Sequence, residues 1–261
     1  MLVDSHCHLD RLDLSLYSGG LSEVLKNAAA NDIGHLLCVC VVLDQFPAML
    51  NLVKDYDHVS VSAGLHPDEM EVNEPSVEEL IALGSEPKCV GIGETGLDYY
   101  RDTEHQERQK ERFRNHIRAA KTLQKPLIIH TRAASLDTIA IMQSENASEA
   151  GGVLHCFTES WEMAKQALDL GFYISFSGII TFKNAEDLRE VVKKVPIDRI
   201  LIETDAPYLA PVPYRGKQNQ PAYVKYTAEA VAALKKMDYA QIAEQTTDNF
   251  FSLFKASKLN L

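Results

Sequence analysis

The sequence predicts an α/β fold, and within that class a TIM-type (β/α)8 barrel that forms a single domain over residues 1–261. Eight short apolar segments, rich in β-branched residues, alternate with intervals that carry apolar residues at helical spacing. The segments are too apolar to leave one face in water, which favours a parallel sheet covered by helices and closed into a barrel. A chain of 261 residues is long enough for one such domain.

Each expected strand is short and bounded by polar or turn-forming residues. The expected strands are Leu2–Cys7, Leu36–Val42, Val59–Leu65, Cys89–Glu94, Pro126–His130, Gly152–Cys156, Phe172–Phe176 and Arg199–Thr204. The expected helices are Glu23–Ala30, Phe46–Asp55, Val77–Leu83, Glu104–Leu123, Ser135–Ser144, Trp161–Leu170, Ala185–Val192 and Ala222–Lys236. An extra C-terminal helix, Tyr239–Phe254, is expected to pack outside the barrel.

The start of one helix has a clear chemical signature. Pro75 and Ser76 precede Val77, and Glu79 follows Ser76 by three residues, which is the pattern of a capping box. The helix is therefore expected to begin at Val77.

Charge and composition limit the class of partner. The net charge is −11, which opposes tight non-specific binding to duplex nucleic acid, so a DNA partner would be bound weakly and with the help of cations. The sequence shows no signal peptide, no apolar run of the roughly 18 residues that span a bilayer, and five Cys without a CxxC pair. We therefore expect a cytoplasmic protein with no membrane association and no obligate protein partner.

The ends of the expected strands carry the residue types that bind metal ions. Active sites of such barrels lie at the carboxyl ends of the strands. Four His and two carboxylates occur at these ends in five strands: His6, His8, Glu94, His130, His155 and Asp205. A single strand-end His is more often structural, but this coincidence is hard to obtain from core packing. Imidazole and carboxylate together suit Zn2+, Mn2+ or Ni2+.

Alternation of side chains along a strand predicts which of these residues face inward. His6 and His8 are two residues apart and should point to the same side, the barrel interior. The same argument places Glu94 on the strand face that carries Val90 and Ile92.

The sequence resembles the TatD family of metal-dependent deoxyribonucleases, within the amidohydrolase superfamily of barrels. The resemblance covers nearly the whole chain and includes all the family's metal-ligand positions. It rests on these motifs: Asp4-Ser5-His6-Cys7-His8-Leu9, Gly64-Leu65-His66-Pro67, Gly91-Ile92-Gly93-Glu94-Thr95-Gly96-Leu97-Asp98, Pro126-Leu127-Ile128-Ile129-His130-Thr131-Arg132, His155-Cys156-Phe157, Glu203-Thr204-Asp205-Ala206-Pro207-Tyr208 and Tyr214-Arg215-Gly216-Lys217.

The resemblance implies a site for two divalent ions, with Zn, Mg, Mn and Ni as candidates. It implies that His6, His8, Glu94 and Asp205 surround one ion. It also implies that Glu94, His130 and His155 surround the second, with Glu94 between the two ions. In related barrels a carboxylated Lys can bridge the ions, but no Lys occurs at the end of expected strand 4 or 5, so Glu94 is the carboxylate suited to that place.

Two residues, Asp205 and His66, are candidates for catalysis beside Glu94, and Glu203 is a candidate for supporting a ligand. Asp205 is the candidate general base, or else a ligand alone, because proton transfer needs a carboxylate within hydrogen-bond reach of the attacking water. Glu203 shares the strand face of Asp205 and lies deeper, where it is expected to bond a ligating His. His66 closes a Gly-Leu-His-Pro turn, where it either contacts a phosphate or leaving group or serves the turn.

Residues on the neighbouring loops are candidates for substrate binding. Arg132, Arg215 and Lys217 are suited to phosphate, although solvation of the surface explains them as well. Tyr208, like Tyr99 and Tyr100, could stack on a base, with packing at the barrel rim as the alternative. Tyr208 follows the end of strand 8.

The other histidines are set aside. His35, His58, His105 and His116 are expected at helix ends or on helices, away from the catalytic face. The charged residues of 104–125 are interpreted as a solvated helix face.

The resemblance, together with Arg132 and Arg215, implies a deoxyribonuclease, with a 3′–5′ exonuclease acting on single-stranded DNA as the expected form. The alternative is a small-molecule amidohydrolase or esterase that uses the same metal site, because a barrel does not determine its reaction. A non-catalytic binding protein with a structural metal site is a third hypothesis. Ligands at an open barrel mouth argue against it, since structural sites are closed.

Overall fold

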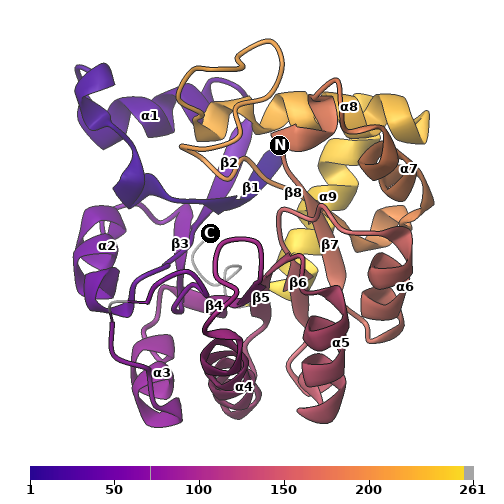
Figure 1. The fold of residues 1–261 in the computed structure, drawn as a ribbon. Coiled ribbons are helices and arrows are strands. Elements are labelled where there is room, and N and C mark those ends of the chain that lie inside the picture. Colours follow the sequence, from indigo (N-terminus) through magenta and orange to yellow (C-terminus); the bar gives the residue numbers. More distant parts are fainter. Residues whose placement is uncertain (71, 256–261) are drawn as a thin grey trace.

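The fold is a ring of parallel strands with helices on its outside. The computed structural model describes residues 1–70 and 72–255, and its eight strands form one sheet in the order β1 to β8, each pair parallel. Figure 1 shows this ring from one end. A parallel bridge between Cys7 and Ala206 joins the first strand to the segment after the last, and the Asp205 N–H donates to the His6 carbonyl at 2.9 Å. The predicted (β/α)8 barrel is therefore confirmed.

Strands and helices alternate along the described chain as predicted. The strands are β1 (Leu2–Cys7), β2 (Ile33–Cys38), β3 (Val59–Ala63), β4 (Cys89–Asp98), β5 (Leu127–Arg132), β6 (Gly152–Leu154), β7 (Tyr173–Phe176) and β8 (Ile200–Ile202). The helices are α1 (Gly20–Ala29), α2 (Phe46–Val53), α3 (Val77–Gly84), α4 (Gln106–Leu123), α5 (Ser135–Ser144), α6 (Trp161–Asp169), α7 (Glu186–Lys194), α8 (Val224–Lys235) and α9 (Tyr239–Leu253).

Helix α3 begins where the sequence predicts. Ser76 Oγ accepts a hydrogen bond from the Glu79 N–H at 3.2 Å, and Glu79 Oε2 accepts one from the Ser76 N–H at 2.8 Å. The capping box is thus complete, and it fixes the end of the loop that follows β3.

Strand β2 lies earlier in the chain than predicted. The apolar run that ends at Val42 led to an expected strand over Leu36–Val42, but β2 is Ile33–Cys38. Residues 39–42 are buried and extend past the end of β2 toward the site, where the Val39 N–H donates to the Cys7 carbonyl at 2.8 Å. The apolar run therefore indicates which residues are buried, and it does not mark the end of the strand, because buried residues continue beyond its paired part.

Strand β4 does not alternate as the sequence analysis assumed. Ile92 belongs to the large outer cluster and lies close to Gly84 of α3, whereas Val90 belongs to a smaller inner cluster. The two side chains thus point to opposite sides, and the expectation that Glu94 shares one face with both was wrong. In the pairing of β4 with β3, Val61 faces Cys89 and Ser62 faces Gly91, so Val90 is an extra residue that separates the faces of Val90 and Ile92. A second shift, in the pairing of β4 with β5, falls between Ile92 and Thr95, where Gly93 has a φ of 142°.

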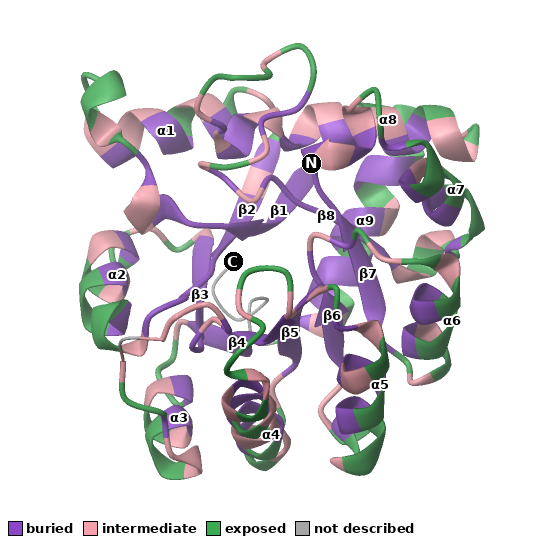
Figure 2. Ribbon diagram, in the orientation of Figure 1, coloured by how far each residue is buried: buried purple, intermediate pink, exposed green. Residues whose placement is uncertain are grey.

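Helix α9 closes the amino-terminal end of the barrel instead of joining the outer layer. Its residues Phe250, Phe251 and Phe254 cluster with one side chain from each of seven strands. Its Asn249 side chain donates to the carbonyls of Ile197 and Ile200, where β8 starts. Figure 2 shows buried strands and helices whose exposed residues face outward. The opposite, carboxyl ends of the strands are left for a site.

Two further observations concern the cysteines and the possibility of a membrane-spanning helix. Cys7, Cys38, Cys40, Cys89 and Cys156 are all free thiols. Among the helices of residues 1–70 and 72–255, none is both long and apolar enough to cross a membrane.

Two buried histidines should make the fold sensitive to mild acid. Burial lowers the pKa of His35 and of His116 from 6.5 to about 4. The unfolded chain takes up these protons near pH 6.5, so stability that is full above pH 6.5 should be lost as pH falls toward 4. Each ring should contribute about 3 kcal/mol to this loss.

Urea unfolding of the wild type and of His35→Gln between pH 7.5 and 4.5 checks this expectation. The free energy of unfolding should fall less steeply with acid in the variant, since one group no longer titrates. Other histidines affect both proteins equally and cancel in the comparison. Parallel pH profiles would contradict the assignment of this sensitivity to His35.

Candidate metal centre

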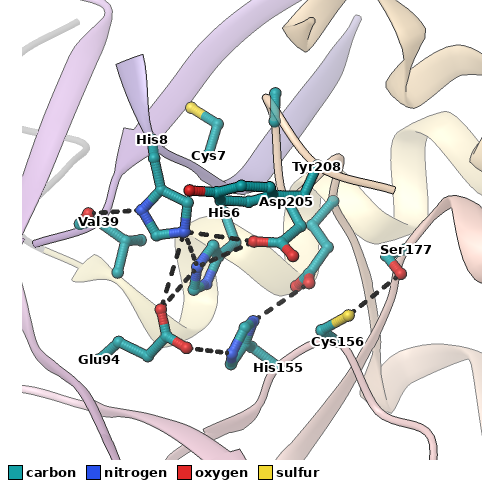
Figure 3. A network of polar contacts seen from close by, with 12 residues as sticks. His6, Cys7, His8, Val39, Glu94, His155, Cys156, Ser177, Asp205 and Tyr208 are labelled. Atoms are coloured by element: carbon teal, nitrogen blue, oxygen red, sulfur yellow. Dashed lines mark hydrogen bonds and ion pairs between the residues drawn. The ribbon is translucent and has the colours of Figure 1, made fainter. Parts of the chain in front are cut away.

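The carboxyl ends of the strands bring several histidine rings and carboxylates to one place (Figure 3). His6 and His8, from the end of β1, point to the same side, with their Nε2 atoms 3.2 Å apart. Cys7 points away from them, and its thiol donates to the Leu37 carbonyl. The ring of His6 stacks on that of His155, with centroids 3.8 Å apart.

Glu94 lies between two groups of histidines. Its Oε2 lies 3.2 Å from His6 Nε2 and 3.8 Å from His8 Nε2. Its Oε1 lies 3.2 Å from His66 Nε2, 3.3 Å from His130 Nδ1 and 2.8 Å from His155 Nε2. Each carboxylate oxygen therefore faces a different set of nitrogens, which is the arrangement required to join two adjacent cation sites.

Two glycines of β4 allow the backbone to carry Glu94 into this position. Gly93 and Gly96 have φ values of 142° and 130°, in the region that favours glycine. A Cβ at Gly93 would lie 2.4 Å from the Ile128 carbonyl oxygen, and one at Gly96 would lie 2.0 Å from that of His130. Close approach of β4 to β5 around Glu94 therefore requires the absence of side chains at these two positions.

Asp205 enters the site from the segment after β8. Its Oδ1 lies 3.2 Å from His8 Nε2 and 3.8 Å from His6 Nε2. Its φ of 57° is left-handed, a conformation that Asp tolerates better than most residues. The neighbouring Thr204 is held by the buried Asp4 carboxylate, which accepts from its N–H at 2.8 Å and from its hydroxyl at 2.6 Å. This contact fixes β1 and the segment after β8 together beside Asp205.

The outer nitrogens of three histidines face hydrogen-bond acceptors. His8 Nδ1 lies 2.9 Å from the Val39 carbonyl, and His130 Nε2 lies 3.0 Å from Asp98 Oδ2. His155 Nδ1 lies 3.3 Å from Glu203 Oε1. A ring that donates through its outer nitrogen presents a lone pair at the inner one, as metal-binding histidines do. This donor set fits divalent ions of the zinc, manganese or nickel type.

The electrostatics of the centre favour added positive charge. Although burial disfavours charge, the carboxylates Glu94 and Glu203 raise the pKa of His155 well above its ordinary value. Burial likewise opposes ionisation of Glu94, but His155, His66 and His6 hold its pKa well below the usual range. Against the same opposition from burial, His8 lowers the pKa of Asp205. Ionised carboxylates at this depth need compensation, which protons or metal cations can provide.

His66 differs from the other histidines in its hydrogen bonding. The backbone N–H of Asp68 donates to His66 Nδ1 at 3.1 Å, so the neutral ring carries its proton on Nε2. That atom lies 3.2 Å from Glu94 Oε1, where a proton can be donated. His66 is therefore suited to donate a hydrogen bond rather than a lone pair.

Among residues 1–70 and 72–255, three groups of side chains have possible ligand atoms that lie within 4.8 Å of one another. They are His6–His8–Asp205, His66–Glu94–His130 and His6–His155–Glu203. The first agrees with the sequence analysis. In the second and third, His66 accepts from a backbone donor and Glu203 faces the outer nitrogen of His155, so both are better placed to orient other groups.

Of the expected substrate-binding residues, Tyr208, Arg215 and Lys217 lie on loops at this end of the barrel. Arg132 was expected on a loop, but it is the last residue of β5. Tyr208 is half exposed, with its ring 6.2 Å from that of His8. The Arg132 guanidinium lies 3.9 Å from the ring centroid of Tyr100, and that of Arg215 lies 3.7 Å from the ring centroid of Phe182. Lys217 follows on the same loop as Arg215, with its ammonium 5.9 Å from the ring of Tyr214.

The sequence analysis missed one functional candidate, Asp98, although it follows Glu94 by four residues on β4. It also assigned His35 to the wrong element. It placed His105 and His116 correctly, at the start of a helix and within it, but too far from the site. His35 lies within β2, where it is buried. His105 immediately precedes α4 and so lies on the catalytic side. His116 is buried, and its Nε2 accepts from the Leu65 N–H next to His66.

Comparison with known proteins decides the family. The family model described as TatD related DNase matches residues 3–255. The chain belongs to this family. An Escherichia coli relative, the uncharacterized metal-dependent hydrolase YcfH, is 52% identical over 254 residues, covering 97% of this chain and 95% of the relative. The crystal structure of YjjV, a TatD homologue from Escherichia coli, superposes with a TM-score of 0.90 at 29% identity and covers 97% and 98% of the two chains.

A more distant relative has a more specific name. The 3′–5′ ssDNA/RNA exonuclease TatD of Salmonella typhimurium is 31% identical over 250 residues, covering 94% of this chain and 96% of the relative. The TatD-family resemblance drawn from the motifs is thus confirmed, and the chain is a member of a family of metal-dependent hydrolases.

Proposed function

We propose that this TatD-family chain hydrolyses phosphodiester bonds at the 3′ ends of single-stranded DNA, with two divalent ions in the centre around Glu94. The observation that carries the proposal is the division of histidines between the two oxygens of one buried carboxylate. The name of the Salmonella relative supports the choice of nucleic acid.

One ion is proposed to bind His6, His8, Glu94 and Asp205, and the other Glu94, His130 and His155. Divalent ions at such a place supply Lewis acidity, which acidifies the attacking water and offsets charge on the phosphoryl group. Their identity is proposed to be Zn, Mg, Mn or Ni.

The residues around the ions have distinct proposed roles. The ionised Asp205 accepts a proton from the attacking water, since its pKa is low enough to leave the carboxylate free at neutral pH. His66 donates its Nε2 proton to a phosphoryl or leaving-group oxygen, because its Nδ1 is already an acceptor. Glu203 holds the ring of His155 through Nδ1.

The rim of the barrel is suited to unpaired bases. Tyr100 is 69% exposed and Tyr208 is 50% exposed, and both follow strands that end at the site. Unstacked bases can stack on such rings, and Arg132 and Arg215 supply positive charge for phosphates nearby. With a net charge of −11, the chain should bind DNA weakly and favour free single-stranded ends over duplex.

The test is hydrolysis of a 5′-labelled single-stranded oligonucleotide with Mg2+, Mn2+ or Zn2+. A ladder that shortens from the 3′ end is expected, arrested by phosphorothioate linkages at the last 3′ positions and by excess chelator. An RNA of the same sequence and a blunt hairpin show the preference among nucleic acids.

Intact oligonucleotides with every metal would overturn the nuclease proposal. If the protein then cleaves a carboxylic ester or a small amide in a metal-dependent way, the alternative of a small-molecule hydrolase replaces it. Shortening from the 5′ end would retain the nuclease and overturn its polarity.

A further inference from the structure

Helix α4 carries a stripe of buried polar side chains, although the outer helices of a barrel ordinarily bury apolar ones. Gln109, Arg112 and His116 follow one another at helical spacing, and each is at most 1% exposed. Arg is rarely buried to this degree without a specific partner. The interpretation of the charged residues of 104–125 as a solvated helix face was therefore wrong for Arg112.

Gln109 holds the end of β4 through both atoms of its amide. Its Oε1 accepts from the Asp98 N–H at 2.8 Å, and its Nε2 donates to the Asp98 carbonyl at 3.2 Å. The Asp98 carboxylate in turn lies 3.0 Å from His130 Nε2. Gln109 therefore fixes the backbone of the residue that orients His130.

Arg112 and His116 hold the turn that carries His66. Arg112 donates to the carbonyls of His66, Pro67 and Glu69, and to the carboxylate of Glu74.

His116 holds the residue before that turn. Its Nε2 accepts from the Leu65 N–H at 3.0 Å, and its Nδ1 donates to the Arg112 carbonyl at 2.8 Å. The lowered pKa of His116 keeps the ring neutral, as this acceptor role requires. The backbone on both sides of His66 is thus fixed to α4.

We propose that α4 is the positioning helix of the site: Gln109 sets His130 through Asp98, and Arg112 with His116 sets His66. These residues act through others and touch neither substrate nor ion. We call the contacts from Gln109 to Asp98 the His130 arm, and the contacts from Arg112 and His116 the His66 arm. Both arms start from one rigid helix, so they fix the distance between His130, a proposed metal ligand, and His66, a proposed hydrogen-bond donor. The His66 arm rests on the proposed function, whereas the His130 arm is tested by metal binding alone.

The first experiment measures the affinity of metal-depleted, full-length protein for Mn2+, with free Mn2+ followed by electron paramagnetic resonance. Gln109→Met removes both bonds to Asp98 at similar volume and should weaken Mn2+ binding about 10-fold, as loss of an outer partner does. Gln143→Met, an exposed Gln of α5, is the matched control and should bind Mn2+ as the wild type does.

A double-mutant cycle separates positioning from general stability. If Gln109 acts through Asp98, the effect of Gln109→Met on Mn2+ affinity should vanish in an Asp98→Ala background. Equal losses in both backgrounds, or unchanged affinity in a Gln109→Met variant that merely melts lower, would overturn the His130 arm.

The second experiment tests the His66 arm by measuring kcat. Arg112→Lys keeps the charge but loses the planar fork, and it should lower kcat on the 3′-end substrate about 10-fold while Mn2+ affinity stays within about 2-fold. Arg118→Lys, exposed on the same helix, is the control. An unchanged kcat in Arg112→Lys, with the wild type active, would overturn this arm. If the wild type leaves DNA intact, the proposed function fails and the Mn2+ measurements still decide the other arm.

Discussion

Replacing Glu94 with Gln should reduce kcat/KM on single-stranded DNA by more than roughly 10³-fold, beyond the 10- to 100-fold losses typical of outer partners. The amide keeps the shape of the side chain but removes the charge shared by both sets of nitrogens. One oxygen becomes an NH2 group that faces histidine lone pairs. The change should therefore disturb both proposed ion sites at once.

Metal content and turnover together check this expectation. Elemental analysis after dialysis against Mn2+ should show fewer bound ions in Glu94→Gln than in the wild type. Glu86→Gln, an exposed position just before β4, makes the same chemical change outside the site and should leave both quantities unaltered. Full metal content with wild-type turnover in Glu94→Gln would contradict the central role of this carboxylate.

The order of elements was predictable because it depends on local patterns. Alternating apolar segments and helical periodicity are visible in a short window, so all eight strands were found. The boundaries of β2 were not, since residues 39–42 are as apolar as a strand yet continue past its paired part. The alternation of β4 also failed, first at Val90, an extra residue in the pairing with β3, and again at Gly93, where the backbone has a positive φ that the pattern does not encode.

The inner groups of the site were accessible to sequence reasoning because the fold places strand ends together. Their outer partners were less accessible. Val39 contributes a backbone carbonyl, and because every residue has one, the sequence does not indicate which carbonyl contacts His8. Asp98 could have been found, because it follows Glu94 on the same strand. Arg112 and His116 had no such signal, since their spacing is equally common on solvated helices, and their partners lie 46 and 51 residues away in the chain.

Asp205→Asn should lower kcat by about 10²- to 10⁴-fold, the usual contribution of a general base. The substitution preserves the size of the side chain and one oxygen, but removes the basicity required to accept a proton. Asp198→Asn, exposed just before β8, is the matched control and should retain full turnover.

The dependence on metal concentration separates the two roles that Asp205 can have. If Asp205 were a ligand alone, saturating Mn2+ would refill the site in Asp205→Asn and restore kcat. If it accepts the proton, kcat stays low even at saturating Mn2+. Restored turnover at high Mn2+ would therefore remove Asp205 from proton transfer and leave it as a ligand beside His8, 3.2 Å away.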